Sequence, residues 1–297
     1  MESTFIIVKT KVLLAHMKNR RSKMVSKIDS YENELEIKQH PFQQNVEQDD
    51  YADMGNVYFA FIDVLGFKYT YESMMHVTGN ENKVDKEDPY KKFRDVFNYF
   101  FELMNATEFI QKDKDTYAGQ TSDSLYFYTK KQRIDYLVEF IKIFILFNQY
   151  AMSKNVFFRG GIAHGTLTRN KRYQFYGDSV IKAYLLESVI ASNPVIYIDT
   201  KTRSEILSYL RKDEDFTEET SFIDHDNNKR YYIKPFYQIH KEDIINNFQG
   251  NVNLREYKLA DIHKVILRNK EIFEYYPKTF CKYTFLETII NNLIEKE

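Results

Sequence analysis

The sequence predicts an α+β domain, an antiparallel-rich sheet covered by helices, with its core elements in the order βαββαβ. Two observations support this prediction. Apolar runs of strand length alternate along the chain with longer segments whose apolar residues recur at helical spacing. Glycines and polar clusters separate these segments, as expected for turns. The chain has 297 residues, of which 43% are apolar and 29% charged, enough for a sizeable buried core.

Each core element follows from a local pattern. An almost continuous apolar run between Gly55 and Gly66 is typical of a buried strand, and two segments with helical spacing predict amphipathic helices. Strand-forming residues on both sides of Asp123 predict a hairpin, and an apolar run with a glycine pair predicts the last core strand. In chain order, these elements are expected at 57–64, 93–104, 117–129, 136–152 and 157–168.

The elements that follow the core come in a mixed order. They are expected as a helix at 177–190, a strand at 194–199, a helix at 201–211, a strand at 231–239 and paired helices within 254–297. The βαββαβ order is that of the split, ferredoxin-like arrangement, in which the first strand lies beside the hairpin and helices cover one side of the sheet. Three parts are predicted: an N-terminal extension (1–50), a core (51–212) and a C-terminal strand and helical tail packed on the core (213–297), with 213–230 as a linker.

Charge and composition exclude several classes of function. The formal net charge of -1 gives no global attraction to nucleic acid or to an anionic membrane. A single cysteine, Cys281, excludes an intrachain disulfide and argues against a cysteine-based metal site, which favours the cytosol as the compartment. No stretch approaches the ~18 uninterrupted apolar residues of a membrane span. Function is therefore expected to depend on local chemistry.

Two aspartates stand in apolar surroundings. Asp63 follows Phe59, Ala60, Phe61 and Ile62, and Asp123 precedes Leu125, Tyr126 and Phe127. A carboxylate in such a setting is costly to bury unless a cation or several donors satisfy it. Either aspartate alone is equally typical of a turn or a strand end. Because the first strand and the hairpin are adjacent in the expected sheet, the pair predicts a shared site for two Mg²⁺ or Mn²⁺ ions, which prefer oxygen ligands.

Four segments in this order resemble class III nucleotidyl cyclases: FIDVLGF (61–67), TSDS (121–124), RGGIAHG (159–165) and YGDSVIKAYLLE (176–187). Their residues are similar to those of the bacterial pyrimidine cyclases of the Pycsar antiphage systems. The segment KYTFLETIINN (282–292) also resembles the C-terminal tail of those proteins. The resemblance implies a class III cyclase core, a homodimer with active sites at the subunit interface, and a cyclic messenger that activates a separate effector. It also implies a pyrimidine nucleotide as substrate, UTP before CTP.

The resemblance also implies roles for individual residues. The carboxylates of Asp63 and Asp123 and the carbonyl of Val64 would bind the metal ions. The backbone N–H groups of the three residues that follow would bind phosphate; these are Leu65, Gly66 and Phe67.

The chain departs from adenylyl cyclases at four positions. The base-reading Lys and Asp of those enzymes fall on Gly119 and Gln174, which argues against ATP and leaves Gln174 to read a pyrimidine edge. The transition-state Asn and Arg fall on Ile181 and Leu185, which cannot stabilise anionic oxygen. Another cation must then do so.

Arg159 is the first candidate for that cation, because it lies on an otherwise apolar strand and needs an anionic partner. A structural salt bridge explains it equally well. Other candidate cations are Lys182, Arg169, Lys171 and Arg172. Phe59 and Phe61, on the same strand face as Asp63, are candidates to stack on a base, although core packing is an alternative for at least one of them.

For three further residues a structural role is an alternative to a functional one. Asp178 and Ser179 fit the cap of a helix that begins after Gly177, and a strand histidine such as His164 is more often structural than a general base.

The leading hypothesis is a uridylate cyclase that converts UTP to 3′,5′-cyclic UMP and pyrophosphate. The alternatives are a cytidylate cyclase, a cyclase-like protein that binds nucleotide without turnover, and a polymerase-like transferase, which lacks an evident basic template surface.

Overall fold

The structure is a computed structural model, and the following concerns the part of the chain that it describes: 52–66, 89–107, 110, 113–170, 174–213, 216–217, 221–239, 254–255 and 257–294. Three predictions fall outside these residues: the extension 1–50, the phosphate-binding role of Phe67, and the candidate cations Lys171 and Arg172.

The core has the predicted βαββαβ order. Its elements are β1 (Ala52–Val64), α3 (Pro89–Ala106), β2 (Tyr117–Thr121), β3 (Ser124–Lys130), α5 (Ile134–Ser153) and β4 (Phe158–Arg169). The four strands lie in the sheet order β2-β3-β1-β4, and every neighbouring pair is antiparallel. This confirms the α+β class and the ferredoxin-like arrangement, with β1 beside the hairpin.

Short strands extend the described sheet beyond β4. In space the order continues β4-β6-β8-β7, where β6 (Ile196–Ile198) is parallel to β4, and the two-residue β5 (Phe175–Tyr176) pairs with the far end of β4. The region 213–230, predicted to be a linker, contains β7 (Ile223–His225). The strand predicted at 231–239 is only β8 (Tyr231–Ile233).

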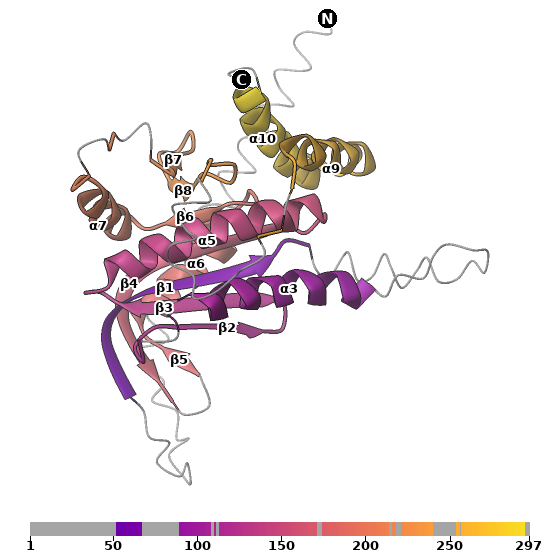
Figure 1. Ribbon diagram of the computed structural model, residues 1–297. Helices are drawn as coiled ribbons and strands as arrows, with labels where there is room; N and C mark the ends of the chain where they lie inside the picture. The colour runs from indigo at the N-terminus through magenta and orange to yellow at the C-terminus, as the bar shows by residue number, and fades with distance from the viewer. Residues whose placement is uncertain are drawn as a thin grey trace, which may run out of the picture. The chain divides into compact units, whose positions relative to one another are not determined.

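Helices cover both faces of the sheet, whereas one covered face was expected. Helices α3 and α5, together with α7 (Thr200–Leu210), pack against the β1 residues Tyr58, Ala60 and Ile62. Figure 1 shows α3 and α5 lying across the same side of the strands. The opposite face, with Val57 and Phe59, is covered by α6 (Asp178–Leu185) and the π-helical turn η1 (Leu186–Ile190).

Helix α6 crosses β4 at very short range. A Cβ on Gly161 would lie 2.3 Å from the carbonyl oxygen of Ala183 in α6, so a larger residue would push the helix away from the strand. The RGGIAHG segment of β4 therefore serves helix packing, and it fixes the height of α6 and η1 above the sheet.

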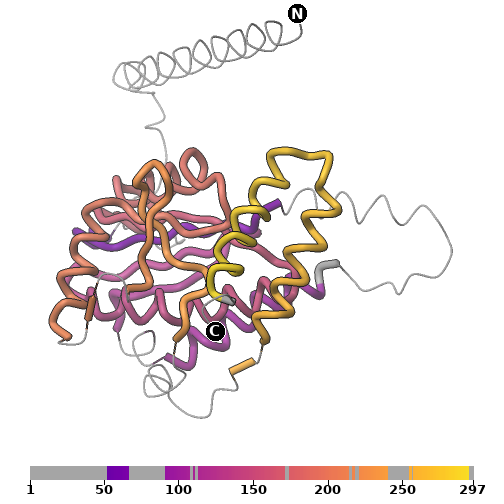
Figure 2. Tube along the Cα trace, turned by 90° about the horizontal axis from the view of Figure 1, so that it is seen from above, coloured from indigo at the N-terminus to yellow at the C-terminus, as the bar shows by residue number. Residues whose placement is uncertain are grey.

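Two helices end the described chain, α9 (Leu259–Ile272) and α10 (Pro277–Ile294). They pack on each other and form a separate apolar cluster with Met152, Phe157 and Leu65. Figure 2 shows this yellow pair beside the indigo end of β1. The helices within the described ranges include none that is both long and apolar enough to cross a membrane.

Candidate active site

Asp63 and Asp123 lie at the same end of two paired strands. Asp63 is the second-last residue of β1 and stands opposite Ser124, the first residue of β3. Asp123 is the second residue of the two-residue turn that joins β2 to β3, and its carbonyl accepts the N–H of Val64 at 3.3 Å. The Ser124 hydroxyl donates to Oδ1 of Asp63 at 3.0 Å. The pairing of β1 with β3 thus places the two aspartates at the same end of the sheet, where the charge of Asp123 acts on Asp63.

Burial and mutual repulsion make negative charge costly at Asp63. Desolvation raises the pKa of the Asp63 carboxyl, and the charge of Asp123 raises it further; the bonds from Ser124 and Val64 and the charge of Arg159 only partly oppose this. The Asp63 side chain keeps 22% exposure, so an ion from solvent can reach it. A bound cation would relieve the repulsion between the two carboxylates.

Arg159 stands opposite Asp63 on the other side of β1, in the pairing of β1 with β4. Its Nη2 atom lies 3.8 Å from Oδ2 of Asp63 and 2.7 Å from Oε1 of Glu187. The short contact to Glu187 is an ion pair whose angles do not make a hydrogen bond, and the buried Nε of Arg159 has no hydrogen-bond partner in the described part of the chain. The Arg159 side chain keeps 28% exposure, so an anion from solvent can reach its guanidinium.

Glu187 is a member of this cluster that the sequence analysis missed. Its side chain is 4% exposed; burial raises the pKa of its carboxyl, Arg159 lowers it, and the charges of Asp63 and Asp123 raise it. Glu187 belongs to η1, and the wider π turn is what carries it toward Arg159. The 3.6-residue spacing used to predict α-helices does not reveal a π turn, so the position of Glu187 could not be predicted from it.

Lys282 on α10 is a second residue that the sequence analysis missed. It is half-buried, and this burial, with a further contribution from the charge of Arg159, lowers the pKa of its ammonium group. Its place in the resembling tail segment was visible in the sequence, but its approach to a strand more than a hundred residues earlier was not.

The predicted phosphate-binding amides are only partly compatible with the structure. The Leu65 N–H donates to the carbonyl of Phe157 at 2.7 Å, so it is already used within the protein. Gly66 is exposed with a φ of 74°, a conformation that glycine adopts without strain. The chain therefore turns at Gly66, directly after Val64 and Leu65.

The two candidate stacking residues differ. Phe59 is 1% exposed and packs against Phe175 with ring centroids 5.7 Å apart, so it is a core residue and the prediction that it contacts a base is not supported. Phe61 is half-buried and meets the edge of Tyr184 at 6.0 Å. Of this pair, only Phe61 keeps accessible surface near Asp63.

Gln174 does not meet Asp63 within one chain. It precedes β5, which pairs with the far end of β4, and it exchanges hydrogen bonds with Asn170. Arg159 and Arg169 mark the two ends of β4, ten residues apart, which corresponds to about 33 Å of extended strand. A site that uses both Asp63 and Gln174 would require a second chain.

The other candidate cations are occupied by partners distant from Asp63. Lys182 pairs with Asp178 at 2.7 Å, and Arg169 donates to the Tyr128 hydroxyl at 2.6 Å. Asp178 accepts from the N–H and hydroxyl of Thr166 and makes no cap bond to α6, which corrects its predicted role.

His164 and Ser179 are structural. His164 is buried, its backbone N–H donates to the carboxylate of Asp199, and burial lowers the pKa of its imidazole. Ser179 is also buried, and its hydroxyl donates to the Thr166 carbonyl rather than capping α6.

The donor set fits a hard divalent cation only with help from a ligand. Two carboxylates and the Val64 carbonyl at the end of β1 are oxygen donors of the kind that Mg²⁺ and Mn²⁺ prefer. Within the described residues, however, no group of three or more His, Cys, Asp or Glu side chains is arranged to hold a metal ion. Further oxygens would have to come from a bound molecule such as a triphosphate.

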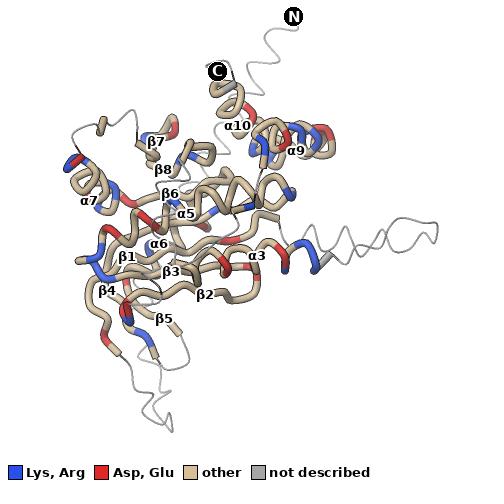
Figure 3. The backbone as a smooth tube through the Cα atoms, in the orientation of Figure 1, with Lys and Arg blue, Asp and Glu red and all other residues tan. Residues whose placement is uncertain are grey.

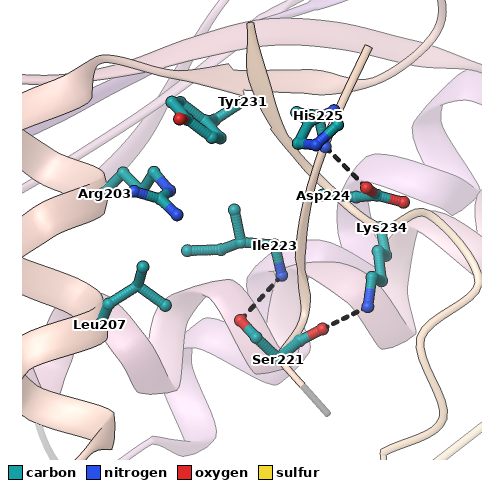
Figure 4. A pocket seen from close by; sticks show the side chains of 8 residues that line it. All are labelled: Arg203, Leu207, Ser221, Ile223, Asp224, His225, Tyr231 and Lys234. Carbon is teal, nitrogen blue, oxygen red and sulfur yellow. Dashed lines mark hydrogen bonds between the residues drawn. The ribbon is translucent and has the colours of Figure 1, made fainter. Parts of the chain in front are cut away.

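A cavity of about 250 Å³ lies elsewhere, between α7 and the strands β7 and β8 (Figure 4). Arg203 stacks over the Tyr231 ring at 4.0 Å, and Lys234 donates to the Ser221 carbonyl at 2.6 Å. Strands β4 and β6 separate β8 from β1, so this cavity is not part of the Asp63 site.

No protein-family model and no curated protein matches this sequence. Solved structures that resemble it include the adenylyl cyclase CyaB from P. aeruginosa, with a TM-score of 0.41 and 15% identity over 62% of this chain and 95% of that one. A bacterial light-regulated adenylyl cyclase has a TM-score of 0.40 and 11% identity over 76% of this chain and 69% of that one. A class III adenylyl cyclase-like ATP-binding protein from Pseudomonas aeruginosa has a TM-score of 0.33 and 15% identity over 52% of this chain and 35% of that one. At such scores the likeness carries no argument about activity, and the fold class follows from the sheet order itself.

Proposed function

We propose that this protein is a class III-type nucleotidyl cyclase that converts a pyrimidine nucleoside triphosphate, UTP before CTP, into a 3′,5′-cyclic nucleotide and pyrophosphate. One observation carries the proposal: Asp63 and Asp123 meet at the paired ends of β1 and β3 in a partly buried setting that raises the pKa of Asp63. A pair of repelling carboxylates with solvent access is suited to binding divalent cations.

In the proposed reaction the 3′ oxygen of the ribose bonds to the α-phosphorus. The bond from that phosphorus to the bridging oxygen breaks, pyrophosphate leaves, and the 3′-hydroxyl proton passes to water. Asp63, Asp123 and the Val64 carbonyl would hold two Mg²⁺ or Mn²⁺ ions, which when bound neutralise the triphosphate and lower the pKa of the hydroxyl. Arg159 would bind phosphate oxygens, and Phe61 would hold the base in place.

An exposed apolar stripe supports the proposal of a homodimer. Four large apolar side chains on α6 and η1 are 46–69% exposed: Ile181, Tyr184, Leu185 and Val189. Their spacing places them on one side of the helix, facing away from β4. Such a patch commonly marks a protein interface, and a twofold dimer would pair the patch with itself. A partner chain would then bring its own Gln174 to the Asp63 end of this chain.

Steric crowding at Gly119 supports a substrate other than ATP. A Cβ at this position would lie 2.5 Å from the ring of Tyr126, so the base-reading lysine of adenylyl cyclases does not fit here unless Tyr126 moves. The pyrimidine preference, a cytosolic location and a role in antiphage signalling through a separate effector come with the resemblance to the Pycsar cyclases.

The alternative function is nucleotide binding without turnover. It is favoured by Ile181 and Leu185, which are exposed and apolar where adenylyl cyclases carry the transition-state Asn and Arg.

A polymerase-like transferase finds less support. Figure 3 shows lysines and arginines interspersed with acidic residues on the described elements, rather than gathered in a band suited to a template.

Incubation of the purified protein with Mn²⁺ and each of the four nucleoside triphosphates tests the proposal. We expect a cyclic product from UTP, or from CTP as second choice, with little from ATP. Asp123→Asn serves as the inactive control. Metal-dependent nucleotide binding without any product would support the alternative, and cyclisation of ATP alone would contradict the pyrimidine assignment.

A further inference from the structure

Helix α10 is docked against the rim of the proposed active site. Tyr283 of α10 meets the ring of Phe157 with centroids 5.2 Å apart, and Leu65 packs into the same apolar cluster. Phe157 lies two residues before Arg159, and Leu65 lies two residues after Asp63. These contacts hold the first half of α10 beside the ends of β1 and β4.

A second contact fixes the same helix from the side of η1. Phe285 packs against the same small apolar cluster as Leu186, the residue before Glu187. Its ring also meets that of Tyr232 at 5.9 Å. Aromatic anchors on two flanks of one helical turn leave little freedom to that turn, and Lys282 is part of it.

The surroundings of Lys282 differ from those of the other paired lysines on α9 and α10. Lys264 of α9 pairs with Asp261 and is 76% exposed, while Lys270 pairs with Glu287. Lys282 is half-buried, and within the described residues no carboxylate pairs with it. Burial lowers the pKa of the Lys282 ammonium, and the positive charge of Arg159 lowers it further.

No carboxylate of the described residues pairs with the half-buried ammonium of Lys282, so its donors are available to a ligand. Asp63 and Glu187 pair with Arg159 rather than with Lys282. An anionic ligand is a suitable partner for such an ammonium group. The ligand that the proposed reaction brings to this position is the phosphate chain of a nucleoside triphosphate.

We propose that Lys282 binds the polyphosphate of the substrate together with Arg159, so that α10 supplies a cation from the same chain. This inference rests on the proposed cyclase function. It assigns to the C-terminal helix the charge that Ile181 and Leu185 do not provide. Lysine binds phosphate as a compact charge with three rotatable donors, which suits a side chain that comes from a neighbouring helix.

Three variants test the proposal: Lys282→Met, which keeps the apolar stem, Lys282→Arg, which keeps the charge, and Lys264→Met as a matched control on an exposed lysine of the same helical pair. The first measurement is the affinity for inorganic tripolyphosphate with Mn²⁺ by calorimetry. We expect Lys282→Met to weaken binding by at least about tenfold, because one charge-assisted bond is lost. We expect Lys282→Arg to stay within about threefold and Lys264→Met to leave the affinity unchanged.

The second measurement is turnover of the nucleotide that the wild-type protein cyclises, with KM and kcat determined separately. A merely structural lysine would change the melting temperature and leave the tripolyphosphate affinity of the folded protein intact, whereas a phosphate-binding lysine changes KM or kcat with the melting temperature preserved. If Lys282→Met does not fold, Lys282→Gln replaces it.

The outcomes separate the two proposals. Tripolyphosphate binding that depends on Lys282, with no cyclic product from any nucleotide, would support the lysine and overturn the cyclase. A cyclic product with equal KM, kcat and tripolyphosphate affinity in wild type and Lys282→Met would support the cyclase and overturn the lysine. Wild-type protein that binds no tripolyphosphate at millimolar concentration would also overturn it.

Discussion

Two groups of charged residues lie on the α6 side of β4, and they are in opposite electrostatic states. The Asp63 cluster consists of Asp63, Asp123, Arg159 and Glu187, and burial raises the pKa of two of its carboxyls, Asp63 and Glu187. The Asp178 cluster consists of Asp178, Lys182 and Thr166. Hydrogen bonds from Lys182 and Thr166 hold the pKa of the Asp178 carboxyl well below its usual range.

The difference separates an aspartate that we propose to bind metal from one that supports the fold. Asp178 has a lysine and two donors of Thr166 as partners, so its negative charge is satisfied within the protein. The Asp63 cluster has three carboxylates and one arginine, which contacts those of Asp63 and Glu187, so the excess negative charge is available to an external cation. Both aspartates stand in resembling motifs, so the motif alone does not distinguish them.

The largest expected effect is that of Asp63→Asn on catalysis. We expect cyclic product formation to fall by at least about 1,000-fold, or about 4 kcal/mol, since a metal ligand is lost. The fold should survive, because asparagine can still accept from Ser124 and the buried charge is removed. Product assays and urea unfolding check both parts. Full activity in this variant would remove Asp63 from its proposed role.

The next effect concerns stability inside the Asp63 cluster. Arg159→Met is expected to lower the free energy of unfolding by about 3 kcal/mol, because Glu187 is left as a buried charge without its cation. In the double variant Arg159→Met/Glu187→Gln we expect at least about 1 kcal/mol of this to be recovered. Urea unfolding of the four proteins gives the coupling energy. Strict additivity would show that the ion pair contributes nothing beyond its separate side chains.

A smaller effect is expected from the Asp178 cluster. Asp178→Ala removes the acceptor for Thr166 and should cost about 1 kcal/mol of stability. Because the folded-state pKa is lowered, this contribution is present above the ordinary value of 3.8 and is lost as the pH falls through the folded-state pKa. Wild type and variant should therefore converge in stability in strong acid. A difference that persists unchanged there would mean that the charge of Asp178 is unimportant.

The smallest expected effect comes from His164, which belongs to neither cluster. Burial lowers its pKa, so the neutral imidazole is favoured in the folded protein: its contribution to stability is present above 6.5 and is lost as the pH falls through the lowered pKa. Its charged surroundings are Glu205, Asp199, Lys201 and Lys131, and the Tyr58 ring packs at 5.5 Å. His164→Gln should flatten the stability profile between pH 7 and the acid range. An identical slope in both proteins would contradict this assignment.

Local patterns predicted most of the core elements. The apolar run of β1 and the helical spacing in α3 and α5 gave the βαββαβ order, because a buried strand and an amphipathic helix each leave a periodic pattern in their own residues. The order in turn placed the hairpin beside β1 and Asp123 beside Asp63. The prediction that helices cover one face was wrong because α6 packs on the second face through Val180 and Ala183, a contact that its own helical pattern did not assign to either face.

The sequence by itself determined the α+β class and the meeting of two acidic side chains at paired strand ends, because both depend on short-range pattern and on the rule that hairpin strands are neighbours. Only the tertiary structure decided which other charges join them. Glu187 arrives through a π turn and Lys282 through the packing of a helix that follows β1 by more than two hundred residues. Contacts of that range are set by the fit of whole surfaces, which no local repeat records.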